Sequence, residues 1–507
     1  MGVFMNAITM GWIAVAIYVL ATGYLTYRGA KKTKDLSSYS VGSKDIPPIM
    51  VGLSLTAQLT SVATFVVNPG LIYKYGLSGM LGFGVAAALG ITCGLFLFSK
   101  RFLRVGNTVS AITVPQWIGK KYDSKALRSI FAIISLALTA FGVLIIVALS
   151  LSLGQLLGIS PYLDGAYNGA FTWLITAVVL FVFTYMMIGG ANTHAYTNSI
   201  QGIIMLIVAL ILIGSGLHLF FKGDGLFTRL AAQDPNLVSV VNPASLYFRN
   251  IFEVFFCNFI VGLAIVCQPH IVSKVLYLKN EKQVKPYLMT AVVAGFVFAL
   301  VMIVGFYARV QFPEIARADF VVPTYIAQTF SPILQVVITI GILCAGLSTL
   351  EGILLSLSTI FSTDIFMPLL SGKKEDAKVI MKKAMNYGKV LLIVIAGVMI
   401  YLSVSQVKNP IGGSVAIFGM YGVYLLFSTT FFPLAAGMFM PKIKRQSIIS
   451  GVVASIILYL GTAYFKWTFM SNNPAFLATV AIIGGWVVVF ALNPIFKKDS
   501  EPVPEAA

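Results

Sequence analysis

Two apolar segments of the chain each carry a narrow stripe of small and hydroxyl-bearing residues. In SLTAQLTSVATFVVNPG, the spacing i, i+3, i+4, i+7 and i+11 of one helical face gives Ala57, Thr60, Ser61, Thr64 and Asn68. In CAGLSTLEGILLS, the same spacing gives Ala345, Ser348, Thr349, Gly352 and Ser356. Such ridges allow close packing between membrane helices. They equally suit a sodium site, because hydroxyls and carbonyls freed at a helix break supply the oxygen ligands that a hard cation prefers. The stripes alone support both interpretations about evenly.

The composition requires these stripes to lie within a membrane. Of the 507 residues, 58% are hydrophobic and only 10% are charged, against about 25% charged in soluble domains. A soluble enzyme, a nucleic-acid-binding protein and a disordered protein are therefore excluded, and we expect an all-α polytopic membrane protein. Hydropathy divides the chain into thirteen candidate spans, many near the ~20 residues that cross a bilayer as a helix. They are 8–27, 49–75, 78–99, 127–155, 170–188, 197–220, 249–277, 286–310, 325–360, 387–405, 411–437, 446–466 and 474–495.

The basic residues are distributed unevenly among the loops between these spans. Loops on one side of the predicted membrane hold 27 of the 35 Lys and Arg residues. Because basic loops stay in the cytoplasm, we expect an integral plasma (inner) membrane protein with its N-terminus outside and its C-terminus in the cytoplasm. This topology explains the net charge of +18 without a nucleic-acid partner. Beyond the lipid bilayer, the sequence indicates no obligate protein partner.

The order of the spans is consistent with two inverted halves. Two five-span units of opposite orientation fit residues 49–220 and 249–437, and each begins with an interrupted span. We expect the interruptions at Asn68-Pro69-Gly70 in the first unit, and at Gly262 and Gln268-Pro269-His270 in the second. Helices broken at matching places in inverted halves indicate the binding site of a secondary transporter. The remaining divisions are a first span and cytoplasmic loop (1–48), an external loop (221–248), and two final spans with a tail (438–507).

Three segments carry a resemblance to a known family: ITVPQWIGKKY, CQPHIVSKVLY and AGLSTLEG. On these segments the chain resembles the sodium:solute symporter family from about residue 40 to 440, and its QPHI sequence is very similar to one in the proline symporters. The resemblance implies a leucine-transporter-like fold of two inverted five-helix repeats, and a transporter rather than an enzyme. Sodium would be the coupling ion, with no other cofactor. The implied sodium ligands are backbone carbonyls at Ala57, Thr60 and Ala345 and side-chain hydroxyls at Ser348 and Thr349. All five lie on the two stripes, so both arguments favour sodium binding over packing alone.

Two positions depart from the family pattern. Many relatives have a Thr-Asp pair after GG near the sixth span, and in some of them this Asp helps to form a second sodium site. Here GGANTHAYTNSIQG places Asn198 at that position, while Glu351 stands where relatives with the second site have a small hydroxyl residue. An ionisable residue deep in a span is a functional candidate, so we hypothesise that Glu351 replaces the missing Asp as a cation or proton ligand. Structural pairing of Glu351 with a neighbouring Asn or hydroxyl is the equally supported alternative.

The expected solute follows from the broken second span. Sugar carriers have amide and carboxylate side chains at positions matching Leu59, Ala63 and Thr64, and proline symporters have an Asp matching Leu59, but this chain lacks these groups. The residues expected to face the solute are Gln58, Ser61, Thr64, Phe65, Asn68 and Asn258. Neutral donors beside half-helix N-termini suit a small carboxylate. We therefore predict sodium-coupled symport of a short monocarboxylate such as acetate, propionate, pyruvate or lactate. The alternatives are a sodium/proline or other amino-acid symporter, or a proton-coupled carrier of the same fold.

The remaining polar residues are expected to be ordinary features of a membrane protein. His194, His218 and His270 are too far apart for a metal-binding motif, and we expect them to form interfacial hydrogen bonds. Asp364 and Glu253 are expected near membrane edges, within reach of water.

Several segments carry expectations about local structure. Residues 112–128 resemble one interfacial helix on the cytoplasmic face, with Trp117 and Ile118 toward lipid. We expect Gly189-Gly190 and Gly412-Gly413 in loops or hinges, and the four cysteines as packing residues. The sequence contains no G-x-x-x-x-G-K-[ST] motif, so ATP is not the expected energy source.

Overall fold

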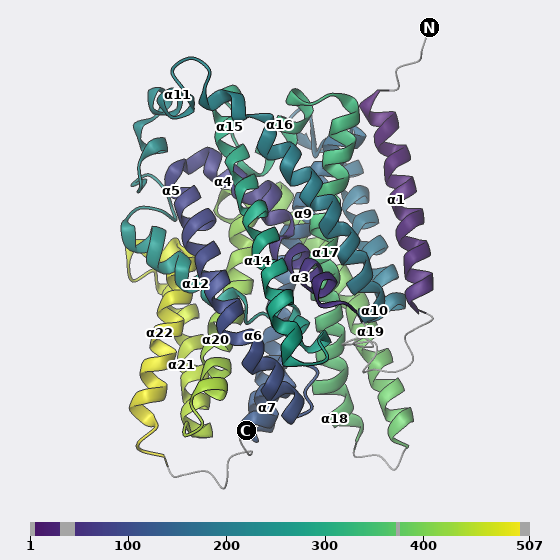
Figure 1. Cartoon of the computed structure of the whole chain (residues 1–507), viewed down its shortest axis with the longest axis vertical. Helices are drawn as coiled ribbons and strands as arrows, with labels where there is room; N and C mark the ends of the chain where they lie inside the picture. The colour runs from purple at the N-terminus through teal and green to yellow at the C-terminus, as the bar shows by residue number, and fades with distance from the viewer. Residues whose placement is uncertain (1–5, 31–45, 372–375, 497–507) are drawn as a thin grey trace.

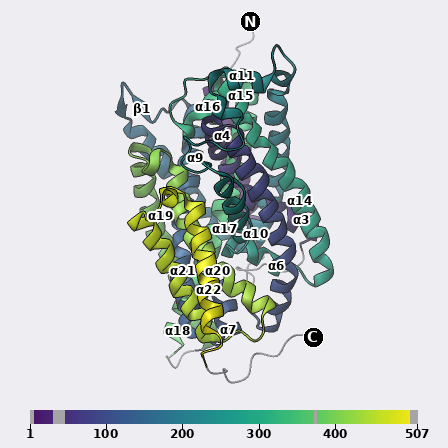
Figure 2. The same ribbon diagram turned by 90° about the vertical axis from the view of Figure 1, so that its left-hand side faces the viewer.

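The chain folds into a bundle of long helices that stand roughly parallel to one another. The computed structural model describes residues 6–30, 46–371 and 376–496. Figure 1 shows α1 at one edge of the bundle and α20, α21 and α22 toward the opposite edge, with the chain termini at opposite ends. In Figure 2, α21 and α22 lie side by side on the face toward the viewer. Within the described residues, strand structure is confined to a small hairpin of β1 (Tyr162–Leu163) and β2 (Ala166–Tyr167).

Twelve helices in the described part of the chain are long and apolar enough to cross a membrane, and a bent pair, Phe252–Ile265 with Pro269–Tyr277, makes thirteen if it counts as one span. The structure therefore agrees with the expected number of spans. The principal helices are α1 (Ala7–Ala30), α3 (Pro48–Val62), α4 (Asn68–Tyr75), α5 (Leu77–Gly79), α6 (Ala88–Thr108), α7 (Val114–Lys121), α8 (Lys125–Ile134), α9 (Leu138–Leu157), α10 (Gly169–Ser215), α11 (Leu226–Gln233), α12 (Asn258–Ile265), α13 (Pro269–Val272), α14 (Val284–Leu300), α15 (Val304–Gln311), α16 (Val321–Thr329), α17 (Pro332–Ile360), α18 (Met367–Leu370), α19 (Ala377–Lys408), α20 (Val415–Phe439), α21 (Arg445–Phe465) and α22 (Pro474–Leu492).

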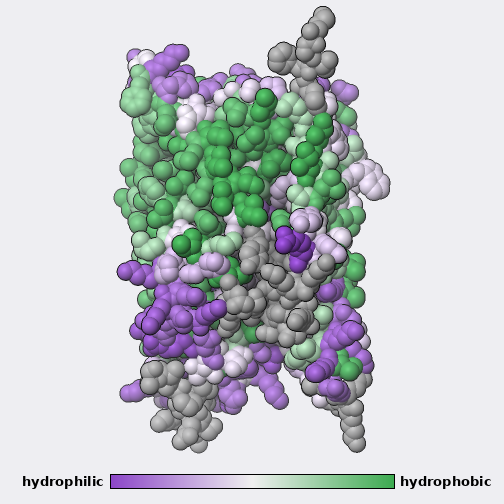
Figure 3. All heavy atoms as spheres, turned by 45° about the vertical axis from the view of Figure 1, so that its right-hand side comes forward, coloured by the Kyte–Doolittle hydropathy of each residue, from purple (hydrophilic) through white to green (hydrophobic). Residues whose placement is uncertain are grey.

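The outer surface of the bundle is suited to lipid. Figure 3 shows a broad hydrophobic belt on one side of the molecule, with hydrophilic residues gathered toward its two ends. Large apolar side chains such as Leu20, Leu210 and Phe296 are exposed on this bundle. In water such a surface would be unfavourable, whereas in a bilayer it contacts lipid chains. The helices that carry the two stripes, α3 and α17, lie inside and pack against each other and against α10.

Both spans that begin the predicted repeats are broken. The second span turns at Ser61, whose backbone angles (φ 56°, ψ 167°) are non-helical and costly for any residue but glycine. The seventh span bends by 56° between Ile265 and Pro269. The expectation of a break at Asn68-Pro69-Gly70 is wrong, because Pro69 lies near the start of α4, where its missing N–H is tolerated. Gly262 is likewise helical, within α12, and its missing side chain allows contact with the backbone of Ala87.

The long helix α10 contains two membrane crossings. Tyr185 and Thr197 both donate to the carboxylate of Glu351. In a straight helix these two residues would be about 18 Å apart at 1.5 Å per residue, too far to share one carboxylate, so α10 must bend between them. Gly189-Gly190 lies in this stretch between two candidate spans and is helical, so the pair lies in no loop, while its position agrees with the expected hinge. Gly412-Gly413 lies in a turn with positive φ at both residues, as expected.

The segment expected to be one interfacial helix is two shorter helices, α7 and α8. The prediction that Trp117 and Ile118 face lipid is wrong, because both are fully buried. The Trp117 ring stacks on Phe102 with centroids 5.4 Å apart. Gly106 and Gly437 border the ring and leave the room it requires. This helix is therefore anchored in the protein core by its aromatic residue.

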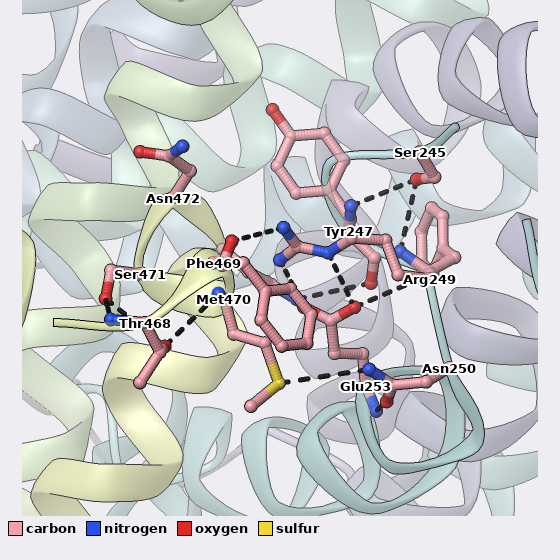
Figure 4. A network of polar contacts seen from close by, with 12 residues as sticks. Ser245, Tyr247, Arg249, Asn250, Glu253, Thr468, Phe469, Met470, Ser471 and Asn472 are labelled. Carbon is pink, nitrogen blue, oxygen red and sulfur yellow. Dashed lines mark hydrogen bonds and ion pairs between the residues drawn. The ribbon is translucent and has the colours of Figure 1, made fainter. Parts of the chain in front are cut away.

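The acidic residues expected near water are buried ion pairs. Glu253 is fully buried, and the Arg249 side chain donates to its two carboxylate oxygens at 2.5 and 3.0 Å. Arg249 also donates to the carbonyl of Phe469, which ties the start of the broken seventh span to the loop between α21 and α22 (Figure 4). Asp364 is paired with Arg128 at 2.6 Å in the same way. Burial of a carboxylate requires such a partner, and the i, i+4 spacing of Arg249 and Glu253 was a usable sequence signal.

Candidate functional site

The two stripes meet where α3 lies against α17. Ser348 and Thr349 of α17 donate hydrogen bonds across the interface to the backbone carbonyls of Ala57 (2.9 Å) and Gln58 (2.8 Å). The same hydroxyls lie 3.0 and 3.3 Å from the carbonyl oxygen of Ala345. All five residues are buried, and we call them the hydroxyl–carbonyl cluster. Two hydroxyls and three carbonyls meeting at a broken helix are the kind of oxygen donors that coordinate sodium in transporters.

The break at Ser61 makes carbonyls of α3 available. Because Ser61 redirects the backbone, the carbonyls of Gln58 and Thr60 lose their regular partners four residues later. The Gln58 carbonyl accepts from Thr349 instead, and the Thr60 carbonyl accepts from the hydroxyl of Thr64. The structure therefore brings four of the five predicted sodium ligands together, while Thr60 lies at the break with its carbonyl bonded inside its own span. Gln58, which we expected only as a solute-facing residue, contributes a carbonyl to the cluster.

Glu351 lies beside this cluster, fully buried among hydrogen-bond donors from α10. Tyr185 and Gln201 (3.2 Å) donate to one carboxylate oxygen, and Thr197 (3.2 Å) donates to the other. His194 Nδ1 lies 3.0 Å from that second oxygen. We call these five residues the Glu351 cage. Four donors around one carboxylate stabilise it without an Arg or Lys in direct contact.

Asn198 connects the Glu351 cage to the hydroxyl–carbonyl cluster. Its amide nitrogen donates to the backbone carbonyl of Ser348 at 3.2 Å and lies 3.5 Å from His194 Nε2. Since an amide nitrogen only donates, the tautomer of His194 that fits both contacts accepts at Nε2 and donates from Nδ1 to Glu351. The two positions that depart from the family pattern, Asn198 and Glu351, therefore lie in one continuous hydrogen-bond network with the predicted sodium ligands.

A cavity adjoins the cluster on the side of Gln58. It is a narrow cavity, partly open to solvent, and its empty volume of about 370 Å³ includes space that belongs to the open solvent. Its lining includes Gln58, His194, His270 and Lys274, together with Thr113 at the start of α7. Figure 1 shows α7 at the same end of the bundle as the C-terminus, so the cavity extends from the broken helix toward that end.

The six residues expected to face the solute occupy different places. Gln58 lines the cavity, and Ser61 forms the break itself. Phe65 is buried against Phe298, with ring centroids 5.8 Å apart. Asn258 donates to the backbone carbonyl of Glu253 at 2.8 Å, within its own span. Thr64 and Asn68 are both partly buried on the continuation of the broken span.

Two functional candidates were missed because the expectation for the histidines is wrong. His194 and His270 are buried rather than interfacial, and both line the cavity, whereas His218 is exposed at the end of the sixth span. Lys274, one helical turn beyond His270, was not among the expected site residues, yet it is buried and lines the same cavity. The i, i+4 spacing of His270 and Lys274 was the sequence signal for this pair.

Gly352 offers a direct test of the cavity. A Cβ atom at this position would overlap the side-chain amide of Gln58, and overpacking of this kind costs about 1–3 kcal/mol. We expect Gly352→Ala to displace the Gln58 side chain and to raise the KM for the solute about tenfold in proteoliposome uptake. Gly397→Ala is the matched control, because a Cβ at Gly397 meets nothing within 4 Å. An unchanged KM in Gly352→Ala would remove Gln58 from solute binding.

Comparison with known proteins relates this arrangement to membrane transporters. The sequence profile of the sodium:solute symporter family matches residues 39–460. A sodium/proline symporter from Staphylococcus aureus is 26% identical over 507 residues, covering 96% of this chain and 92% of that protein. A sodium/pantothenate symporter from Haemophilus influenzae is 22% identical over 447 residues, covering 87% of each.

A solved structure establishes the fold. The structure of a Na⁺-coupled sialic acid symporter superposes with a TM-score of 0.75 at 20% identity, covering 96% of this chain and 98% of that one. The predicted all-α, leucine-transporter-like fold is therefore confirmed.

Proposed function

This chain belongs to the sodium:solute symporter family, and from that premise we propose that the solute it carries together with sodium is a short monocarboxylate such as acetate, propionate, pyruvate or lactate. Membership of the family means that the chain is a transporter rather than an enzyme, that it is integral to a membrane, and that it couples transport to sodium. The main support for a monocarboxylate as the solute is the composition of the residues that line the cavity beside Gln58. The described residues of that lining include a lysine, two histidines, an amide and several hydroxyls, and none of them is Asp or Glu.

The chemistry of the relatives' solutes supports this choice. Proline, pantothenate and sialic acid, named for three related proteins, all carry a carboxylate. A carboxylate is favoured by nearby cations and hydrogen-bond donors. An amino acid would in addition need acceptors for its ammonium group, and the described residues that line the cavity include no carboxylate. A sodium/proline symporter therefore remains the second candidate, supported by the relative at 26% identity.

We propose that sodium binds at the hydroxyl–carbonyl cluster, with Thr60 as a further carbonyl ligand. Sodium bound there would hold α3 against α17, because its ligands come from both helices. Each sodium ion that enters across a potential of 100 mV supplies about 2.3 kcal/mol before its concentration gradient is counted. Glu351 and Asn198 are proposed to contribute a second coupling site, for a cation or a proton.

The proposed orientation places the N-terminus outside and the C-terminus in the cytoplasm of a plasma (inner) membrane. The excess of Lys and Arg in alternate loops supports it. The proposed repeats are residues 49–220 and 249–437, supported by the break in the span that begins each. With this orientation, the cavity beside Gln58 faces the cytoplasm.

Uptake by purified protein in proteoliposomes tests the proposed solute. We expect an inward sodium gradient to drive saturable accumulation of labelled pyruvate, lactate, acetate or propionate, and an equal potassium gradient to drive none. Protein-free liposomes control for diffusion of the neutral acids. Sodium-driven uptake of proline or pantothenate without any monocarboxylate would replace the proposed solute, and uptake driven by a proton gradient alone would replace the proposed ion.

A further inference from the structure

A buried lysine lies beside the cavity without a hydrogen-bonding partner. Lys274 is 1% exposed, and its Nζ atom makes no hydrogen bond within the described part of the chain. Its Nζ atom lies 4.9 Å from the centroid of the Tyr277 ring, and the carboxylate of Glu351 is close enough to interact with its charge, although the two form no hydrogen bond. An ammonium group buried without a hydrogen-bonded anion is costly, so this position requires an explanation beyond packing.

Within the described residues, neither Glu351 nor Asp364 forms a hydrogen bond with Lys274. Glu351 accepts from the donors of its cage. Asp364 is paired with Arg128 and accepts from Thr113, each at 2.6 Å. Both acids therefore already have their hydrogen bonds, and Lys274 remains available to a ligand that enters the cavity.

Other polar atoms around the cavity are also without partners in the described residues. They are both ring nitrogens of His270, the side-chain oxygen of Gln58 and the hydroxyl of Thr359, all buried and all on lining residues. A cation and a neutral imidazole can bind a carboxylate. The amide and the hydroxyl can hydrogen-bond a second polar group on the same small molecule. Together these atoms suit a short organic anion better than a cation or an apolar molecule.

We propose that Lys274 and His270 form a binding station for the carboxylate of the transported solute, with Gln58 and Thr359 binding a keto or hydroxyl group at its other end. This inference rests on the proposed function and adds the residues that recognise the solute. Gln58 links the station to the hydroxyl–carbonyl cluster, because its carbonyl accepts from Thr349 and its side chain lines the cavity. A solute that moves from the broken helix toward the C-terminal end of the bundle passes this station.

Substrate binding by the purified full-length protein tests the station. Titration calorimetry in detergent with pyruvate and saturating sodium is expected to show at least tenfold weaker binding in Lys274→Gln and in Lys274→Met, which preserves the length of the side chain. Binding of sodium in the absence of pyruvate is expected to match the wild type in both variants. Lys285→Gln is the control, because it removes the same charge from an exposed position nearby in sequence. Pyruvamide, which lacks the charge, is expected to bind no better to the wild type than to Lys274→Gln.

The outcomes separate this inference from the proposed function. Pyruvate binding at wild-type strength in both Lys274 variants overturns the station and leaves the proposed function intact. If sodium binding in the Lys274 variants weakens as much as pyruvate binding, the station is overturned as well, because Lys274 would then stabilise the whole fold. Chloride that competes with pyruvate at equal concentration assigns the site to small anions in general and overturns the solute assignment. If the wild type neither binds nor transports any monocarboxylate but transports proline, it is the proposed function that fails.

Discussion

Simultaneous replacement of Ser348 and Thr349 by alanine is expected to abolish sodium-driven uptake. Each hydroxyl lies within 3.3 Å of two backbone carbonyl oxygens, one on α3 and one on α17. A hydrogen-bonding group that interacts with a charge contributes about 1.5–3 kcal/mol, so removal of both should weaken sodium binding at least 100-fold. Measurement of uptake against external sodium in proteoliposomes gives this shift directly, and each single variant should lie between the wild type and the double variant.

The control for this pair is Ser358→Ala on the same helix. Ser358 is buried, and its hydroxyl has no partner among the described residues, so the same chemical change there should leave sodium dependence unaltered. Size-exclusion chromatography shows whether each variant remains folded. A folded double variant with the sodium dependence of the wild type would mean that the two hydroxyls only pack α17 against α3.

Replacement of Glu351 by glutamine is expected to reduce the maximal uptake rate at least tenfold and to lower the number of charges moved per solute. The cage offers donors to both carboxylate oxygens. An amide group in place of one oxygen would turn N–H groups toward some of these donors and would remove the negative charge that a cation or proton requires. The coupling ratio can be measured from the membrane potential at which net solute flux reverses. The same vesicles show whether the pH dependence of uptake is lost with the carboxylate.

Two further variants decide between a coupling and a structural role for Glu351. Exposed Glu314→Gln controls for the loss of one acidic charge and should transport normally. The exchange Asn198→Asp with Glu351→Ser restores the arrangement of many relatives and should recover a part of the uptake that Glu351→Gln loses. If Glu351→Gln keeps the rate, the coupling ratio and the pH profile of the wild type, the carboxylate is a structural hydrogen-bonding group.

The helical spacing of the stripes made the central contact predictable. Residues three and four apart share a helix face, and on this basis Ser348 and Thr349 were expected opposite the second span, where the structure has them. The same reasoning could have found the Glu351 cage, because His194, Thr197 and Gln201 follow the spacing i, i+3 and i+7 on α10. They were missed because nothing in the sequence of α10 alone indicates which helix its polar face contacts.

The break in the second span was harder to predict. Proline is the usual signal for an interrupted helix, and Pro69 suggested a break eight residues beyond Ser61, where the chain turns. The chain instead turns at Ser61, through a backbone conformation that serine rarely adopts and that neighbouring helices must therefore stabilise. The burial of Trp117 was unpredictable for a similar reason, since it depends on room left by Gly106 and by Gly437, which is distant in the sequence.

Gln58 carries a thermodynamic consequence for the whole transporter. Its backbone lies in one proposed binding region and its side chain in the other, so a displacement of this one residue alters the free energy of both. Linkage then demands reciprocity: whatever factor the solute applies to the affinity for sodium, sodium must apply to the affinity for the solute. A solute too small to reach the Gln58 amide would bind without increasing the affinity of the transporter for sodium. The transporter would therefore bind more kinds of solute than it accumulates.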